Sequence, residues 1–462
     1  MRITIPRHFS YWILLLLLQG LFACSESNNS DSDGTGTDDT ENGTDSDIGN
    51  DTDTGPDITE SGGEFLKSAQ PRNMTPTPTE DTLTQLAAAN SAFAADMYTA
   101  LSQADDENLF FSPFSLSVGL AMSYGGAAGT TQTQMADTLH FSSFAEEDLH
   151  NAFNRMLLDL AGRSQAASGD DGGFELSIAN SFFGQKDFPF LSTYLDLLSV
   201  NYGAGIYTMD FQADLAAAVA AINDWIAERT ADKITDALDP NELTPPIFSV
   251  LVNAIYFKAA WNLPFDANDT IDQEFTLLSG ETVTTPMMAQ GEHFSYGQGD
   301  GYQAVSLPYD GEDVEMMIIL PDAETFSTFE AGLSAAKIDD IVQNMASAYS
   351  TWVTLNVPRF HIASKWELKD IFTAMGMEAP FSDEADFSGM SEEFLRIQKI
   401  IHQTDITVDE AGTEAAAATV IVDSNGDADY ATVTLNRPFL FLIRDVPTSS
   451  ILFMGRVTNP SL

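Results

Sequence analysis

The chain is poor in cysteine and in basic residues. Its 462 residues include one Cys, 19 Lys or Arg and 69 Asp or Glu, which gives a formal net charge of −50. A single Cys excludes an internal disulfide and any zinc or iron–sulfur site built from cysteines. The shortage of Lys and Arg excludes nucleic acid as a partner, because neutralising phosphates requires clustered basic side chains.

Local catalytic motifs are missing as well. None of the six His lies in an H-E-x-x-H helix, and the G-x-S-x-G, G-x-x-x-x-G-K-[ST] and G-x-G-x-x-G motifs are absent. We therefore expect a protein that is not an enzyme and that holds neither a cofactor nor a metal.

The apolar content is ample for a large core, with 44% hydrophobic residues and 10% aromatics. The acid excess belongs to the folded part too, because residues 25–60 hold only 12 acids and the chain beyond them holds 57 acids and 17 bases. A soluble, self-repelling surface is one interpretation. The other is adaptation to high salt, where the Debye length shrinks to roughly 3–4 Å.

Residues 1–24 have the pattern of a secretory signal peptide. Basic residues at positions 2 and 7 precede a short apolar run at 11–18, which is too short for a comfortable membrane span. Leu21, Ala23 and Cys24 resemble a bacterial lipobox, in which the cysteine becomes lipidated; an ordinary signal peptide is the alternative. We expect a secreted protein anchored through Cys24 to the outer membrane or cell surface, with the periplasm as a further location.

Residues 25–75 are expected to form an acidic disordered tether. Up to residue 63 this segment consists almost entirely of Ser, Asn, Asp, Gly and Thr. Such a sequence cannot bury enough apolar surface to offset its ordering entropy.

The body, residues 76–462, contains no repeat and no internal linker, so we expect a single domain. Apolar residues recur at helical spacing in three segments: 83–101, 215–238 and 366–375. Strand-like runs occupy 248–257, 314–320, 352–357, 431–435 and 440–444. Helices come early and strands dominate late, which favours the α+β class.

Three segments resemble the serpin family, and the resemblance covers residues 80–462. They are NLFFSPFS at 108–115, LVNAIYFK at 251–258, and VDEAGTEAAAAT at 408–419 with NRPF at 436–439 and FMGRV at 453–457 behind it. The resemblance implies a serpin-like single domain with three β-sheets, eight to nine helices and an exposed reactive-centre loop at about 410–435.

By residue preference alone, the alanines after Thr413 predict the start of a helix. The resemblance instead makes this segment the hinge of the reactive loop, formed by Glu410, Gly412, Thr413, Glu414, Ala415, Ala416, Ala417, Ala418 and Thr419. In serpins a protease cleaves the loop and is held as an acyl-enzyme while the loop enters the central sheet as a new strand. A strand of about 14 residues rises roughly 45 Å, which is enough to cross a domain of this size.

Side chains alternate along a strand, so every second loop residue would face inward after insertion. With Thr413 inward, as in the family, the inward set is Thr413, Ala415, Ala417, Thr419 and Ile421, all small or apolar. This pattern favours an inhibitor. Asp423 departs from it, because a buried carboxylate costs several kcal/mol unless it stays near solvent at the end of the sheet.

Matched positions carry further family roles. Ser112, Ser115, Asn253 and His402 match the polar shutter beneath the opening sheet, and Trp261 matches the breach, where insertion begins. For His402 the alternative is a structural histidine. Glu410 matches the hinge glutamate, but no basic partner is evident, because Pro308 stands where some relatives carry a Lys. Acids at 170 and 171, where glycosaminoglycan-activated serpins are basic, argue against heparin.

The reactive bond is expected at Gly426 and Asp427. Counting from Gly412 by the usual family length reaches Gly426, and counting back from Pro438 reaches Asp427. Residues 422–430 contain no Arg or Lys, so elastase-like, subtilisin-like or chymotrypsin-like proteases fit better than trypsin-like ones. The alternating acids here also resemble a calcium loop, without its Gly and Glu.

Two functions remain open at this point. The first is a suicide-type inhibitor of serine, or cysteine, endopeptidases, whose partner is the target protease in a covalent complex. The second is a non-inhibitory serpin-like binding protein on the cell surface. In either case we expect a monomer that contacts the membrane only through its lipid anchor.

Overall fold

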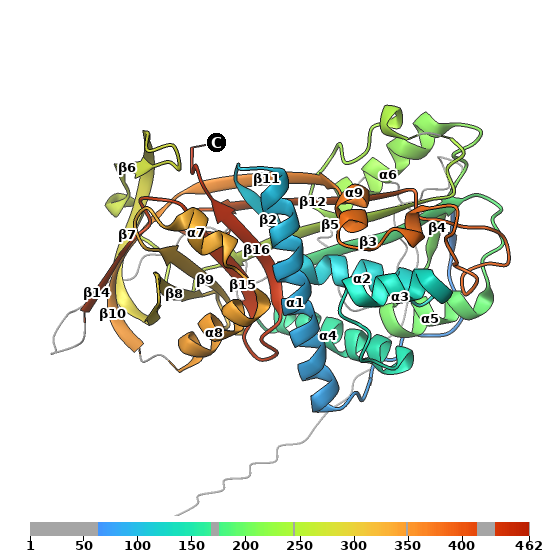
Figure 1. Cartoon of the computed structure of the whole chain (residues 1–462), viewed down its shortest axis with the longest axis horizontal. Coiled ribbons are helices and arrows are strands. Elements are labelled where there is room, and N and C mark those ends of the chain that lie inside the picture. The colour runs from blue at the N-terminus through green and yellow to red at the C-terminus, as the bar shows by residue number, and fades with distance from the viewer. Residues whose placement is uncertain (1–62, 168–174, 244, 348–349, 414–429, 462) are drawn as a thin grey trace, which may run out of the picture. The chain divides into compact units, whose positions relative to one another are not determined.

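The computed structural model describes residues 63–167, 175–243, 245–347, 350–413 and 430–461 (Figure 1). Their α-helices are α1 (Glu80–Ala104), α2 (Pro113–Tyr124), α3 (Gly129–Thr138), α4 (Glu146–Ala167), α5 (Ser192–Tyr202), α6 (Leu215–Arg229), α7 (Phe326–Ala331), α8 (Ala335–Ala346) and α9 (Lys369–Ala374). Short 3₁₀ helices are η2 (Pro240–Glu242), η3 (Ala267–Asp269) and η4 (Ala379–Phe381). Among the described helices, none combines the length and the hydropathy needed to cross a lipid bilayer.

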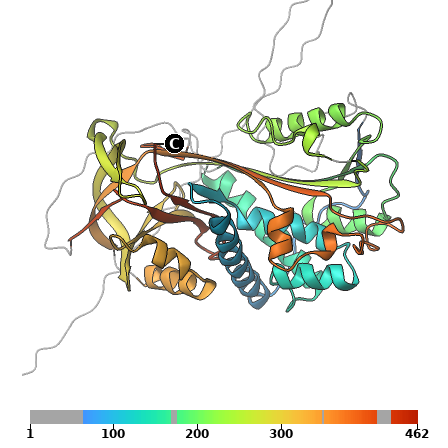
Figure 2. The same ribbon diagram turned by 45° about the horizontal axis from the view of Figure 1, so that its top comes forward.

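The first sheet has seven strands in the order β1-β4-β3-β5-β13-β12-β11. They are β1 (Glu64–Leu66), β4 (Ile206–Met209), β3 (Glu175–Gln185), β5 (Ser249–Ala260), β13 (Gly412–Thr413), β12 (Lys399–Val408) and β11 (Phe360–Glu367). Helix α6 lies on one face of this sheet, and α2, α4 and α5 lie on the opposite face (Figures 1 and 2). A strand added to this sheet must therefore fit between two layers of helices.

The second sheet has nine strands, in the order β14-β10-β7-β8-β9-β15-β16-β2 with β6 paired to β7. They are β14 (Tyr430–Thr434), β10 (Ser350–Pro358), β7 (Thr282–Gly299), β8 (Tyr302–Pro308), β9 (Val314–Pro321), β15 (Phe439–Asp445), β16 (Ile451–Val457), β2 (Leu109–Phe111) and β6 (Ile271–Thr276). The described strands thus form two hydrogen-bonded sheets where three were expected. The reason is β7, which pairs with β10 along one stretch and with β8 along the next and so joins two groups of strands.

The α+β class and the expected strand runs are confirmed, since all five runs fall on strands β5, β9, β10, β14 and β15. Two helices are shorter than predicted: α6 ends at Arg229 rather than continuing to residue 238, and α9 begins at Lys369 rather than at residue 366, which belongs to β11. Ala231 and Asp232 adopt φ values of 49° and 59°, which turn the chain out of α6.

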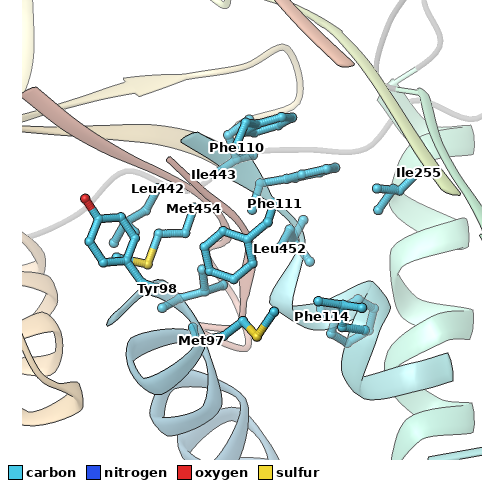
Figure 3. Close-up of a cluster of buried hydrophobic side chains, with 14 of the residues drawn as sticks. Met97, Tyr98, Phe110, Phe111, Phe114, Ile255, Leu442, Ile443, Leu452 and Met454 are labelled. Carbon is cyan, nitrogen blue, oxygen red and sulfur yellow. The ribbon is translucent and has the colours of Figure 1, made fainter. Parts of the chain in front are cut away.

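Helix α2 shows how local sequence positions the core. Ser112 caps it by accepting a hydrogen bond from the backbone N–H of Ser115, and Pro113 occupies the first turn. Every residue of α2 is buried, including three serines whose hydroxyl groups form hydrogen bonds within the protein. Figure 3 shows Phe114 of this helix beside Phe111 of β2 and Met97 of α1, in the core that joins the two sheets.

Residues 64–73, which the sequence places in the tether, pack against the body. β1 pairs with β4 in antiparallel register, and the Phe65 and Tyr207 rings lie 4.5 Å apart between centroids. The Asn154 side chain of α4 accepts a hydrogen bond from Arg72 and donates one to the backbone of Asn73. The edge of the first sheet is therefore covered by a segment that precedes α1.

Candidate functional site: the seam between β5 and β12

The candidate site is the line along which β5 and β12 meet, which we call the seam. The two strands pair in parallel from Lys399 opposite Val250 to Asp405 opposite Tyr256. Beyond that point β13 lies between them, antiparallel to both. We call this the hinge end, and we call the end where β5 and β12 begin the far end.

Gly412 can occupy the hinge end because it has no side chain. Its φ is +152°, and a Cβ added there would lie 2.2 Å from the carbonyl oxygen of Ala259. Next to it, Thr413 is fully buried, and its Oγ1 lies 2.9 Å from the hydroxyl of Tyr309. The first two inserted positions of the family hinge thus lie within the sheet.

Trp261 borders the hinge end, where the resemblance places the breach. Its ring stacks on Tyr309 with centroids 4.5 Å apart, and its indole N–H donates to the carbonyl oxygen of Asp409 at 3.0 Å. Its own backbone N–H donates to the carbonyl oxygen of Ala411. The aromatic pair therefore supports the backbone on which the hinge turns.

Glu410 has a basic partner, contrary to the expectation from the sequence. Arg359, just before β11, donates to its carboxylate from Nε at 2.9 Å, and Thr270 donates a second hydrogen bond. Burial raises the pKa of Glu410, but the hydrogen bonds from Arg359 and Thr270 outweigh it and hold the pKa below its usual value. The partner of Glu410 is therefore not at position 308 but at Arg359, 51 residues before Glu410 in the chain.

The four shutter residues meet in the middle of the seam. The backbone N–H of Ser112 donates to His402 Nε2 at 3.0 Å, and His402 Nδ1 lies 2.5 Å from Asn253 Oδ1. Asn253 Nδ2 donates to Ser115 Oγ at 2.8 Å. This cluster includes Asn180 of β3, which the sequence analysis missed and which donates to the Ser115 carbonyl oxygen. The sequence signal that could have identified this residue is an Asn among the apolar residues of β3.

His402 is held in one neutral form by its two neighbours. Because Nε2 accepts from the Ser112 N–H, the ring proton must sit on Nδ1 and donate to Asn253. Burial lowers the pKa of His402 to about 3. The β5–β12 contact at the shutter is therefore made by uncharged hydrogen bonds.

Several expected residues lie outside the described residues. These are the lipidation site Cys24, the hinge residues Glu414, Ala415, Ala416, Ala417, Ala418 and Thr419, and the reactive-bond residues Gly426 and Asp427. The chain is described again from Tyr430, an exposed residue that opens β14. Within the described residues, no group of three or more His, Cys, Asp or Glu has an arrangement that could hold a metal ion.

Comparisons with known proteins agree with this geometry. A family model described as Serpin (serine protease inhibitor) matches residues 88–460. The leukocyte elastase inhibitor of Sus scrofa is 35% identical over 391 residues, covering 81% of this chain and 100% of that protein. An uncharacterized serpin-like protein of Thermococcus kodakarensis is 36% identical over 376 residues, covering 80% of this chain and 84% of that protein. The crystal structure of Tengpin, a thermophilic serpin in the native state, matches with a TM-score of 0.74 at 27% identity, covering 85% of this chain and 97% of that chain. The chain belongs to the serpin family.

Proposed function

We propose that the protein is a suicide-type inhibitor of endopeptidases, with serine endopeptidases as the main targets and cysteine endopeptidases as a second class. The observation that carries this proposal is β13: the start of the reactive loop already pairs with both strands of the seam. A loop that begins inside the sheet can continue into it by exchanging β5–β12 hydrogen bonds for equivalent ones to the new strand.

The register of β13 supports insertion of the rest of the hinge. Thr413 lies opposite Ala259 on β5 and Val408 on β12. Continued residue by residue, this register would bring position 419 beside Asn253 and His402, where a threonine hydroxyl meets the shutter. Position 423 would reach Ser249, the first residue of β5. An inserted Asp423 would therefore sit where the strands begin rather than in the middle of the sheet.

The proposed chemistry starts at the bond between Gly426 and Asp427. The nucleophilic oxygen of a serine protease attacks the Gly426 carbonyl, the bond to the Asp427 nitrogen breaks, and that nitrogen leaves as an amine carrying the transferred proton. Insertion then competes with hydrolysis of the ester. If insertion is faster, the protease stays attached; if hydrolysis is faster, the protein is only a cleaved substrate.

The target class follows from the loop composition and from one relative. Gly426 and Ala428 suit elastase-like or subtilisin-like pockets, and Tyr430 suits a chymotrypsin-like pocket. A relative that covers most of this chain is named a leukocyte elastase inhibitor. Elastase-like proteases are therefore the first to test.

A panel of these proteases, followed by mass spectrometry of the released C-terminal fragment, tests the proposal. We expect a complex that survives a denaturing gel and a fragment that begins at Asp427. Cleavage by every protease without any such complex would contradict inhibition and favour the non-inhibitory binding protein.

We also propose that Cys24 carries the lipid that anchors the protein to the outer membrane or cell surface. The cysteine stands at a lipobox-like site and is the only one in the chain. Replacing it, as Cys24→Ser, should move the protein from the detergent phase to the aqueous phase in a phase-partition assay. An unchanged partition would favour an ordinary signal peptide.

A further inference from the structure

The far end of the seam holds a buried lysine that the shutter and the hinge do not use. Lys399 is the first residue of β12, and its side chain is only 7% exposed. Its Nζ lies 2.9 Å from Glu242 Oε2 and 3.8 Å from Glu367 of β11. Lys365 of β11 lies 3.8 Å from the other oxygen of Glu242. One carboxylate thus binds two cations from neighbouring strands.

Glu242 comes from the opposite side of the seam. It ends η2, within the connection that leads from α6 into β5. The lysines belong to β12, which forms the other side of the seam, and to β11, which is the neighbour of β12 in the sheet. Since Lys399 is paired with Val250 near the start of β5, this ion pair crosses the seam at its far end.

The connection that carries Glu242 is fixed to the β5 side. The Asn223 side chain of α6 makes two hydrogen bonds to the backbone of Leu238, both 2.9 Å long. Leu238 and Leu243 are buried in an apolar cluster between α6 and the first sheet, to which β3, β4 and β5 contribute most of the strand residues and β12 contributes Ile401. Because this connection also leads directly into β5, we expect Glu242 to follow α6 and β5 when the seam opens.

We infer that Glu242 and Lys399 form a clasp that holds the far end of the seam closed until a strand inserts. The inference rests on the loop insertion proposed above. A new strand moves β5 away from β12 by one strand spacing, about 4.8 Å. A contact of 2.9 Å cannot survive that movement while Leu238 and Leu243 stay packed.

The clasp acts on the rate of insertion more than on the stability of the fold. It is present in the native protein and lost once the far end opens, so it raises the barrier to opening. Removing one partner of a poorly hydrated pair costs more than removing an exposed one. Because Glu242 is 40% exposed, we expect an effect of roughly tenfold on the opening rate.

Glu242→Gln in the full-length protein tests the clasp, with Glu228→Gln as the matched control. Glu228 lies on α6, is 60% exposed and contacts only its neighbour Arg229 among the ion pairs of the described residues. A synthetic peptide with the sequence of residues 413–423 is the probe, and its incorporation into the native protein is followed on native gels. We expect incorporation roughly tenfold faster in Glu242→Gln and unchanged in Glu228→Gln.

A second substitution separates a clasp from a merely structural ion pair. Lys399→Met should also accelerate incorporation, and the double variant should be no faster than the faster single variant, because the two residues act as one contact. Equal rates in the parent and in Glu242→Gln, even with a lower Tm, would overturn the clasp. Failure of the peptide to enter the parent, together with no covalent protease complex, would overturn the proposed inhibitor and the clasp with it.

Discussion

The two ends of the seam are closed by different kinds of contact. At the hinge end, β13 lies between the strands, and backbone hydrogen bonds join it to β5 and β12. At the far end β5 and β12 pair directly, and the Glu242–Lys399 ion pair crosses between them. The shutter between these ends is made of neutral hydrogen bonds.

This difference gives insertion a direction. Backbone pairing at the hinge end can be exchanged one residue at a time, because each bond lost to β12 is replaced by one to the new strand. At the far end, the ion pair between Glu242 and Lys399 is made by side chains, so it cannot be exchanged one backbone hydrogen bond at a time. Opening should therefore begin beside Trp261 and finish beside Lys399.

The largest effect is expected from a charge placed at the hinge end. Thr413→Arg would bury a guanidinium at a site that is fully buried beside Tyr309. Burying an unpaired charge costs several kcal/mol, so the loop should stay out of the sheet and be cleaved as a substrate. The measurement is the covalent protease complex on a denaturing gel.

Thr432→Arg is the control for this substitution, because Thr432 is exposed on β14 and lies on the C-terminal side of the reactive bond, in the part of the loop that does not insert. It should form the complex normally. An undiminished complex in Thr413→Arg would show that the hinge does not have to enter the sheet.

The next largest effect is the response of the shutter to acid. The pKa of His402 is about 3 in the fold and 6.5 in the unfolded chain. The unfolded state therefore binds a proton first as the pH falls below 6.5, and the stability that depends on neutral His402 is progressively lost down to about pH 3. Between pH 7 and pH 4 this amounts to roughly 3 kcal/mol.

His402→Gln isolates this contribution from that of the carboxylates. The variant should be less stable than the parent at pH 7, because it loses hydrogen bonds to Ser112 and Asn253. Urea unfolding should show a weaker dependence on pH between 7 and 4 than in the parent. The same slope in both proteins would contradict a neutral histidine in the shutter.

A smaller effect is expected at the ion pair beside the hinge. Arg359→Gln removes the cation that holds Glu410, and Arg359 is 44% exposed, so the loss should be about 1 kcal/mol. Thermal unfolding at low salt should show the loss, and 1 M NaCl should reduce the difference from the parent because the pair is partly screened. A difference that is equal at both salt concentrations would mean that packing, not charge, holds Glu410.

The smallest effect on inhibition is expected away from the seam. Phe65→Ser removes the ring that packs on Tyr207 at the outer edge of the first sheet, at a cost of about 1 kcal/mol. Met74→Ser, at a residue 58% exposed, is the control. Both variants should form the covalent complex as well as the parent does, and an altered complex in Phe65→Ser would extend the mechanism to β1.

The sequence predicted the elements whose signal is local. The spacing of apolar residues and the residue composition predicted the strand at Val314–Pro321 and most of the helix at Glu80–Ala104. The spacing of family motifs brought Ser112, Asn253 and His402 together, although they are far apart in the chain. The strand and the helix could be predicted because their signals lie in residues close in sequence, and the contact of the three side chains could be predicted because each of them matches a family motif.

The remaining parts depend on contacts between distant residues that no local pattern encodes. Arg359 is one of several exposed or half-exposed bases, and only the turn before β11 brings it to Glu410. Glu242 precedes Lys399 by 157 residues. It also follows α6, which the sequence predicted to end at residue 238 and which ends at Arg229. β7 joins two groups of strands because it is 18 residues long. The spacing of the family motifs does not predict the length of a strand that lies between them.

The measurement that tests the central claim most directly is the melting temperature before and after limited cleavage of the reactive loop. Insertion of about ten residues should add backbone hydrogen bonds of about 1 kcal/mol each. For a domain of this size, that should raise Tm by roughly 10–15 °C. An unchanged Tm after complete cleavage would contradict loop insertion, and the seam would then be a fixed part of a binding protein.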